Sequence, residues 1–207
     1  MIPAKHSKFF EKLFGVWLSF AFRRNFSAFN TIGEYRDQGK SLLVVANHIS
    51  WWDGFWLLRL NQKLFKKKFH VMMLEEQLEK RLFLSKLGAF SIKRNHKSMV
   101  NTINYARNLL TNPSNLLLIF PQGEISSQYD HPHIFQNGWT RIFKGIEHQV
   151  QILLVVHLLD YFSNSKPILY QYLYSPEPSK MVNPNELEEV YNEFYKRCLE
   201  QQKRINK

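Results

Sequence analysis

Residues 42–54 read LLVVANHISWWDG, an apolar run that leads into a polar turn. The apolar residues 42–46 are typical of a strand buried on both faces, the kind found inside α/β sheets. His48 and Asp53 follow at the exit of this strand, and a helix beginning near Ser50 would put Asp53 in its first turn. The carboxylate could then fix one nitrogen of the imidazole and leave the other free. A general base that takes a proton at neutral pH needs this arrangement.

The His48–Asp53 spacing alone is weak evidence for a functional site, because eight His and four Asp in 207 residues produce roughly 0.15 pairs at this spacing by chance. Three further segments of the sequence strengthen it. They read GAFSIKR at 88–94, FPQGEIS at 120–126 after an apolar strand, and FQNG at 135–138. In order and separation, the blocks resemble the glycerolipid (lysophospholipid) acyltransferase family, whose pattern is N-H-x-x-x-x-D, G-x-x-F-I-x-R, F-P-E-G-T-R-S and a later F-x-x-G. The resemblance covers roughly residues 30–165, most of the chain.

The resemblance implies a single α/β domain whose mixed, mostly parallel sheet is flanked by helices. It also implies an acyltransferase that moves a fatty acyl chain from a thioester, acyl-CoA or acyl-ACP, to a hydroxyl or amine of a lyso-lipid or related acceptor. His48 would remove the acceptor's proton, and Asp53 would hold the tautomer and stabilise the imidazolium. No acyl-enzyme, cofactor or metal is expected, and the G-x-S-x-G pattern of a nucleophilic serine is absent from the sequence.

The second block supplies cations. Arg94 stands at its basic position, where the resemblance implies contact with the acceptor's phosphate or a neighbouring anion through bidentate hydrogen bonds. Lys93 replaces the acid often found beside it and makes the site more cationic. The alternative for Arg94 is a solvated side chain in a basic run that includes Lys97.

The third block departs from the family pattern, because Gln122, Glu124 and Ile125 stand where the family has glutamate, threonine and arginine. Gly123 can let a backbone N–H approach an oxyanion or a phosphate, or it can form an ordinary turn. Isoleucine has no donors and Glu124 adds negative charge, so a simple phosphate headgroup should bind less well. We expect Gln122, Gly123 and Glu124 to line a site for a lyso-aminolipid, a glycolipid or a pigment-like alcohol, with a surface loop acid as the alternative for Glu124.

Aromatic and polar residues near these blocks offer further candidates. Trp52 and its neighbours Trp51, Phe55 and Trp56 could wall an acyl-chain groove or pack in the core. The loop at 130–133, which reads DHPH, contains ligand types for a metal, but without a second ligand pair at recognised spacing it indicates polar residues near the acceptor pocket instead.

Composition narrows the class of partner. Lys and Arg number 28 against 17 Asp and Glu, so the net charge is +11 and the pI is near 9.7. This charge favours an anionic membrane surface, a phosphorylated donor or nucleic acid, but no nucleic-acid fingerprint occurs and the basic residues are scattered. A basic cluster at 63–70 suits lipid headgroups, the phosphates of coenzyme A or acyl carrier protein, or plain solvation. The lone Cys198 excludes an internal disulfide.

The N-terminal region contains a short apolar core, residues 13–22, between lysines and the Arg23-Arg24 pair. It is too short to span a bilayer, and no small-residue cleavage site follows. We expect an amphipathic helix on an anionic membrane surface, with packing on the domain's own core as the alternative. The chain then divides into this helix at 1–29 and an acyltransferase domain at 30–207, peripheral to the cytoplasmic face of the cell membrane.

Helical and strand patterns alternate along the rest of the chain. We expect helices at 75–86 and from a Ser98 cap to Asn112-Pro113, and a long C-terminal helix capped by Asn183. Strands are expected at 116–120, 152–159 and 168–174.

Two rival functions stay open from the sequence. An acyl-thioester hydrolase would use the same fold with water in place of the acceptor, and a basic nucleic-acid-binding module would need no lipid at all. A catalytically silent lipid-binding relative is disfavoured because both His48 and Asp53 are present.

Overall fold

The strands of the chain join into one mixed sheet. The computed structural model describes residues 1–93, 96–136, 138–176 and 184–205. Within these ranges the strands are β1 (Ala28–Ile32), β2 (Ser41–Ala46), β3 (Lys68–Leu74), β4 (Ala89–Ile92), β5 (Asn115–Ile119), β6 (Val150–Asp160) and β7 (Ile168–Tyr174). Their order in the sheet is β1-β7-β6-β2-β5-β3-β4.

Most of the strands run parallel. The neighbours β6, β2, β5, β3 and β4 share one direction, while β7 runs antiparallel to β6 and carries β1 parallel to itself. Every residue of β2 and β5 is buried, as expected of central strands covered on both faces. The predicted α/β class, with a mixed and mostly parallel sheet flanked by helices, is confirmed. The carboxyl ends of β2, β5 and β6 therefore meet at one edge, where α/β proteins usually bind ligands.

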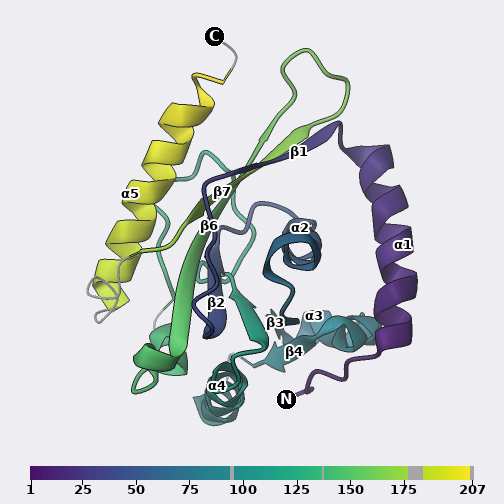
Figure 1. Ribbon diagram of the computed structural model, residues 1–207. Coiled ribbons are helices and arrows are strands. Elements are labelled where there is room, and N and C mark those ends of the chain that lie inside the picture. The colour runs from purple at the N-terminus through teal and green to yellow at the C-terminus, as the bar shows by residue number, and fades with distance from the viewer. Residues whose placement is uncertain (94–95, 137, 177–183, 206–207) are drawn as a thin grey trace.

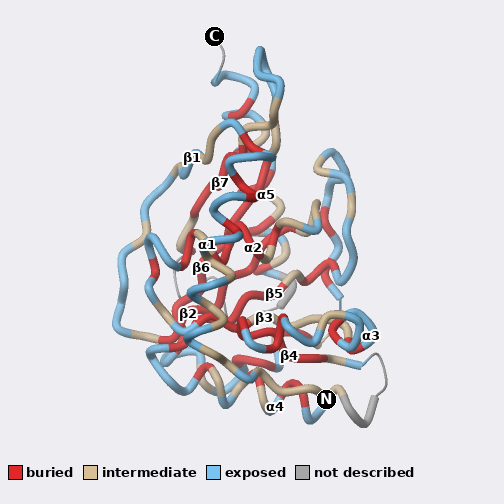
Figure 2. The backbone as a smooth tube through the Cα atoms, turned by 90° about the vertical axis from the view of Figure 1, so that its right-hand side faces the viewer, coloured by how far each residue is buried: buried red, intermediate tan, exposed pale blue. Residues whose placement is uncertain are grey.

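Helices cover both faces of the sheet (Figure 1). In the described ranges they are α1 (Lys8–Asn25), α2 (Asp53–Leu60), α3 (Glu75–Glu79), α4 (His96–Leu110) and α5 (Pro184–Gln202), with the π-helical turn η1 (Asn61–Phe65) and the 3₁₀ turns η2 (Leu82–Leu87), η3 (Trp139–Ile142) and η4 (Glu147–Gln149). Alternate residues of β2 belong to two cores: Leu43 and Val45 pack with α4 and α5, and Leu42 and Val44 pack with α1 and α2. Figure 2 shows the buried backbone concentrated in the strands.

Helix α1 is apolar on two sides. Its inner side packs through Leu18, Ala21 and Phe22, which are buried. Its outer side leaves large apolar side chains in solvent, which we call the outer stripe: Phe9, Leu13, Val16, Trp17 and Phe20. Among the described helices, none is long and apolar enough to cross a bilayer. The helix thus packs on the core of the domain and still presents an apolar surface.

The prediction of one continuous helix over 75–86 is wrong. Helix α3 ends at Glu79, and the chain continues as η2. Leu74, Leu78 and Leu82 stand at four-residue spacing, which favours one helix, but Leu78 is buried while Leu82 is 57% exposed. The core instead receives Leu84 and Leu87 from η2, so the chain must break between the two turns to bury all of them. Tertiary packing has overridden local helical periodicity here.

The other two predicted helices lie close to their expected positions. Helix α4 begins at His96, two residues before the predicted Ser98 cap, and buries Ile103, Ala106 and Leu110. Helix α5 begins at Pro184, as a proline in the first turn favours. Its predicted cap, Asn183, lies outside the described residues.

Candidate active site

His48 and Asp53 lie together at the carboxyl edge of the sheet. Strand β2 ends at Ala46 and α2 begins at Asp53, so the turn between them brings the two side chains together. The distance from His48 Nδ1 to Asp53 Oδ2 is 2.7 Å. The imidazole stacks on the ring of Phe120, which follows β5, with centroids 4.3 Å apart. Among the described residues His48 Nε2 has no hydrogen-bond partner, and the side chain is 24% exposed, so this nitrogen is available to a substrate.

Asp53 is fully buried and held by three donors. Besides His48, the backbone N–H groups of Ile49 and Ser50 donate to Oδ2 at 2.7 and 2.8 Å. Burial raises the pKa of the carboxyl, but the His157 and His48 side chains outweigh this effect, so its pKa lies below the ordinary value. An ionised carboxylate on His48 Nδ1 places the ring proton there and leaves Nε2 as a proton acceptor.

Asn47 ties this turn to β6. Its Nδ2 donates to the carbonyl of His157 at 2.9 Å, and its Oδ1 accepts from the N–H of His157 at 2.8 Å. Because Ala46 pairs with Val155 in the parallel register, the side-chain amide of Asn47 continues the ladder beyond the end of β2. The turn that carries His48 is therefore anchored to the neighbouring strand. Neither Asn47 nor His157 was among the predicted site residues.

Gln122 supports the backbone of His48. Its Oε1 accepts from the His48 N–H at 2.8 Å, and its Nε2 donates to Ser126 Oγ at 2.7 Å and to His133 Nδ1 at 3.1 Å. The Ser126 N–H donates in turn to the His48 carbonyl at 2.9 Å. Gln122 is buried, so its amide group is committed to these internal contacts.

His133 completes the network around Gln122. Burial lowers its pKa to about 4, which keeps the ring neutral and lets Nδ1 accept the amide hydrogen. Asn192 of α5 holds the backbone of His133 at both its N–H and its carbonyl. In the described part of the chain no group of three or more His, Cys, Asp or Glu side chains is arranged to hold a metal ion.

The loop after β5 places the remaining third-block residues. Gly123 has φ +77°, which favours glycine, and its N–H donates to the Phe120 carbonyl at 3.0 Å. The N–H of Gly123, which we expected to approach an oxyanion, is therefore occupied by a hydrogen bond within the turn. Glu124 and Ile125 are exposed, Ile125 at 53%, and they precede Ser126 on the segment that contacts His48.

The second-block cations are only partly described. Lys93 Nζ lies 2.9 Å from Oε1 of Glu75, a buried acid at the start of α3 that also accepts from Ser91 Oγ at 2.6 Å. Lys93 is thus paired within the protein. Arg94 lies outside the described residues.

The aromatic residues of the turn mostly pack inward. Trp52 lies with its ring centroid 5.7 Å from those of Phe22 and Phe26, and so joins α1 to α2. Trp56 is fully buried, whereas Trp51 is 43% exposed. The acyl-chain groove at Trp52 stays a prediction.

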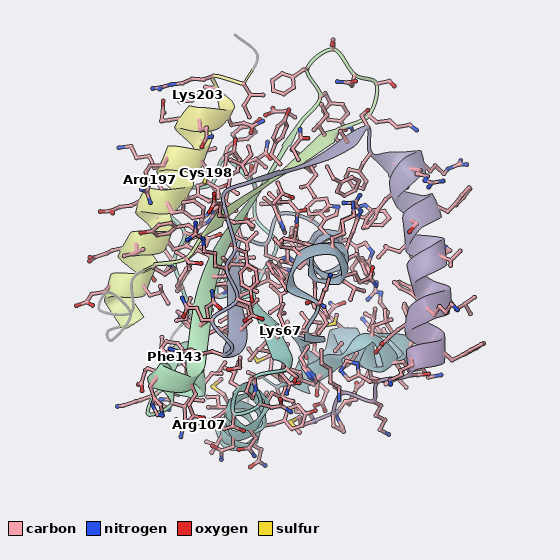
Figure 3. All side chains as sticks on the ribbon, in the orientation of Figure 1. Lys67, Arg107, Phe143, Arg197, Cys198 and Lys203 are labelled. Atoms are coloured by element: carbon pink, nitrogen blue, oxygen red, sulfur yellow. The ribbon has the colours of Figure 1, made fainter. Side chains whose placement is uncertain are left out.

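The basic cluster at 63–70 lies around the amino end of β3, at the opposite edge of the sheet from His48. Lys67, labelled in Figure 3, is almost fully buried and donates to the carbonyls of Lys40 and Pro113, both at 2.9 Å. This lysine therefore joins the amino ends of three strands, and it is not available to a ligand.

The fold and the paired side chains define a class: an α/β protein that holds an imidazole and a buried carboxylate at the carboxyl edge of parallel strands. A family model described as Acyltransferase matches residues 28–157, more than half of the chain. The protein therefore belongs to the Acyltransferase family, which includes the glycerolipid acyltransferases, and the resemblance seen in the sequence is confirmed. The matched segment contains His48, Asp53 and the whole third block. No curated protein matches the chain significantly.

Proposed function

We propose that the protein transfers a fatty acyl chain from an acyl thioester to a hydroxyl or amine of a lyso-lipid or related lipid. Membership of the family supports acyl transfer to lipids in general. The observation that carries the finer proposal is the 2.7 Å contact between His48 Nδ1 and Asp53 Oδ2, which leaves Nε2 available. His48 is then the general base, and Asp53 is its partner.

The reaction needs no acyl-enzyme. His48 Nε2 takes the proton of the acceptor while the acceptor's oxygen or nitrogen attacks the thioester carbonyl. The tetrahedral intermediate collapses, the C–S bond breaks, and the imidazolium returns its proton to the departing thiolate. Asp53 stabilises the ring while it is positively charged. Acyl-CoA or acyl-ACP is the co-substrate in this scheme, and no cofactor takes part.

We infer an acceptor other than a simple glycerol phosphate. Ile125 and Glu124 are exposed on the segment beside His48, in positions where the family pattern has arginine and threonine. An isoleucine offers no hydrogen bond to a phosphate, and a carboxylate repels it. A hydroxylated or cationic headgroup, as in a lyso-aminolipid or a glycolipid, fits this pair of side chains better.

The outer stripe of α1 supports action at a membrane surface. Phe9 is 80% exposed and Phe20 is 66% exposed, and basic residues flank both ends of the helix. Aromatic side chains with cationic flanks are suited to the interface of an anionic leaflet. The inner side of the same helix contacts Trp52 through Phe22, so α1 packs against the turn that holds His48. We propose a peripheral protein of the cytoplasmic face of the cell membrane.

An acyl-transfer assay tests the base. Labelled acyl-CoA and labelled acyl-ACP are each incubated with the protein and a membrane lipid extract, and the labelled product is identified by mass spectrometry. We expect an acylated lipid from the wild type and a loss of about 10²–10⁴-fold in His48→Ala. His148→Ala is the matched control, because His148 is exposed on η4 at the other edge of the sheet. Full transfer by His48→Ala would refute the base, and free fatty acid as the main product would indicate a hydrolase.

Vesicle binding tests the membrane surface. Trp17→Glu combined with Phe20→Glu removes two apolar side chains from the outer stripe, each worth about 1.5–3 kcal/mol when buried. We expect at least a tenfold loss of binding to vesicles that contain phosphatidylglycerol. Leu64→Glu is the control, since Leu64 is 40% exposed on η1 and does not belong to the outer stripe. Equal binding by all three proteins would rule out the outer stripe as the contact.

A further inference from the structure

A second histidine lies behind the carboxylate of Asp53. His157, on β6, is fully buried, and its Nδ1 lies 3.6 Å from Asp53 Oδ1. Neither of these two atoms has a hydrogen-bond partner among the described residues, whereas Asp53 Oδ2 accepts three hydrogen bonds. An unsatisfied oxygen on a buried carboxylate is costly. His157 Nδ1 faces this oxygen from 3.6 Å and is itself without a partner among the described residues.

The surroundings of His157 fix the position of its proton. The side-chain Nε2 of Gln171, on β7, lies 3.2 Å from His157 Nε2. In this orientation of the amide its nitrogen donates, which favours His157 Nε2 as the acceptor and the ring proton on Nδ1, toward Asp53. Asn47 holds the backbone of His157 through two hydrogen bonds, and Trp56 contacts its ring edge-on. The ring is therefore held in one orientation.

We propose that His157 is a positioning residue that donates its Nδ1–H to Asp53 Oδ1 and so holds the carboxylate behind His48. This inference rests on the proposed role of His48 as the base. A movement of about 0.5 Å brings the two atoms within hydrogen-bond range. Hydrogen bonds of this kind often shorten when a substrate binds. With both oxygens bound, the carboxylate cannot rotate away from the His48 ring.

The contact also affects the protonation of the pair formed by His48 and Asp53. The positive end of the His157 N–H dipole faces this pair and stabilises its net negative state. The His157 side chain is one of the contacts that hold the pKa of the Asp53 carboxyl below its ordinary value, against the effect of burial, which raises it. Removing the donor should therefore move the acid limb of the pH–rate profile to higher pH.

Among the described residues, two tyrosines of α5 also interact electrostatically with Asp53. Burial raises the pKa of Tyr191 well above its ordinary value and raises the pKa of Tyr195 as well. Their hydroxyls donate to backbone carbonyls. Both tyrosines stay neutral over the pH range of an activity assay, so a shifted acid limb reports on His48, Asp53 and His157.

Two variants of His157, one without a hydrogen-bond donor and one with, test the proposal. His157→Leu removes the donor, whereas His157→Asn keeps an amide N–H near the position of Nδ1. A hydrogen bond to a charged group is worth about 1.5–3 kcal/mol, so we expect kcat of His157→Leu to fall at least ~10-fold while KM changes less than ~2-fold. Its acid limb should rise by about 0.5–1 pH unit. His157→Asn should recover most of the wild-type kcat and most of the wild-type acid limb. If His157 had a purely structural role, the acid limb would not move in either variant, and the two variants would have the same kcat.

Nuclear magnetic resonance of ¹⁵N-histidine-labelled protein gives a readout that needs no substrate. We expect His157 of the wild type to carry its proton on Nδ1, and the titration of His48 to move to higher pH in His157→Leu. If the wild type transfers no acyl group, the proposed function fails, while this titration still decides the role of His157. A His157 ring protonated on Nε2, or an unchanged His48 titration, would overturn the proposal. Should His157→Leu not fold, the wild-type tautomer and the His157→Asn titration decide it.

Discussion

Replacing Asp53 with asparagine removes the charge behind the base and keeps the shape of the side chain. The amide oxygen can still accept from His48 and from the backbone N–H groups of Ile49 and Ser50. The turn should therefore persist, but with neutral hydrogen bonds in place of charged ones. We expect the free energy of unfolding to fall by about 1–3 kcal/mol.

The effect on the rate follows from the lost charge. His48 becomes positive as it takes the proton, beside a carboxylate that is fully buried. For charge centres about 4 Å apart and an effective dielectric constant near 20, the attraction is about 4 kcal/mol. Its loss corresponds to a decrease in kcat of about 10³-fold. KM should change little, because the ion pair exists only after the proton has moved.

The assay is release of the free thiol from the thioester, measured for the wild type, Asp53→Asn, His48→Ala and the double variant. Since the two residues act as a unit, we expect the double variant to be no slower than His48→Ala. Thermal unfolding shows that each protein is folded at the assay temperature. Activity of Asp53→Asn within tenfold of the wild type, or losses that multiply in the double variant, would refute the reasoning.

Three further changes test other parts of the structure. Ile125→Arg should raise kcat/KM for a lysophosphatidic acid acceptor about tenfold or more, and an unchanged preference among acceptors would remove this loop from the acceptor site. His133→Asn should flatten the pH dependence of stability. Burial lowers the folded pKa of His133 to about 4, below an unfolded value of ~6.5, so stability is full above pH ~6.5 and falls by up to about 3 kcal/mol as the pH drops toward 4, as urea unfolding can measure. Gly88→Ala should lower the free energy of unfolding by about 2 kcal/mol or more, because Gly88 has φ +102° and an added Cβ would meet a backbone carbonyl, whereas Gly54→Ala, with open space around it, is the control in thermal unfolding.

The central strands were predictable because their signal is local. Residues 42–46, 116–120 and 168–174 are nearly continuous apolar runs, and strands occur there to within one residue. Strand β1 was not predicted, because its residues are half-buried or exposed and include polar side chains. It forms through pairing with β7, where Ala28 lies beside Ile168. The sequence around β1 contains no pattern that predicts pairing with a strand so distant along the chain.

The same distinction holds in the candidate site. His48 and Asp53 were visible because five residues separate them and both belong to one block. His157 lies in a different strand, and its only signal was a single histidine within an apolar run. His133 was noted as a polar loop residue, but its contact with Gln122 depends on α5 holding the loop. Sequence spacing cannot predict contacts that depend on sheet order.

Sheet order explains why the third block can change without moving the base. Strand β2 lies between β6 and β5, so the turn after β2 is held by Asn47 on the β6 side and by Gln122 on the β5 side. A glutamine in place of glutamate keeps an oxygen for the His48 N–H and adds an amide hydrogen, for which His133 supplies a neutral acceptor. The exposed Ile125 takes no part in either contact. In the proposed function, we therefore expect substitution at that position to alter which headgroup is accepted while the geometry of His48 and Asp53 is preserved.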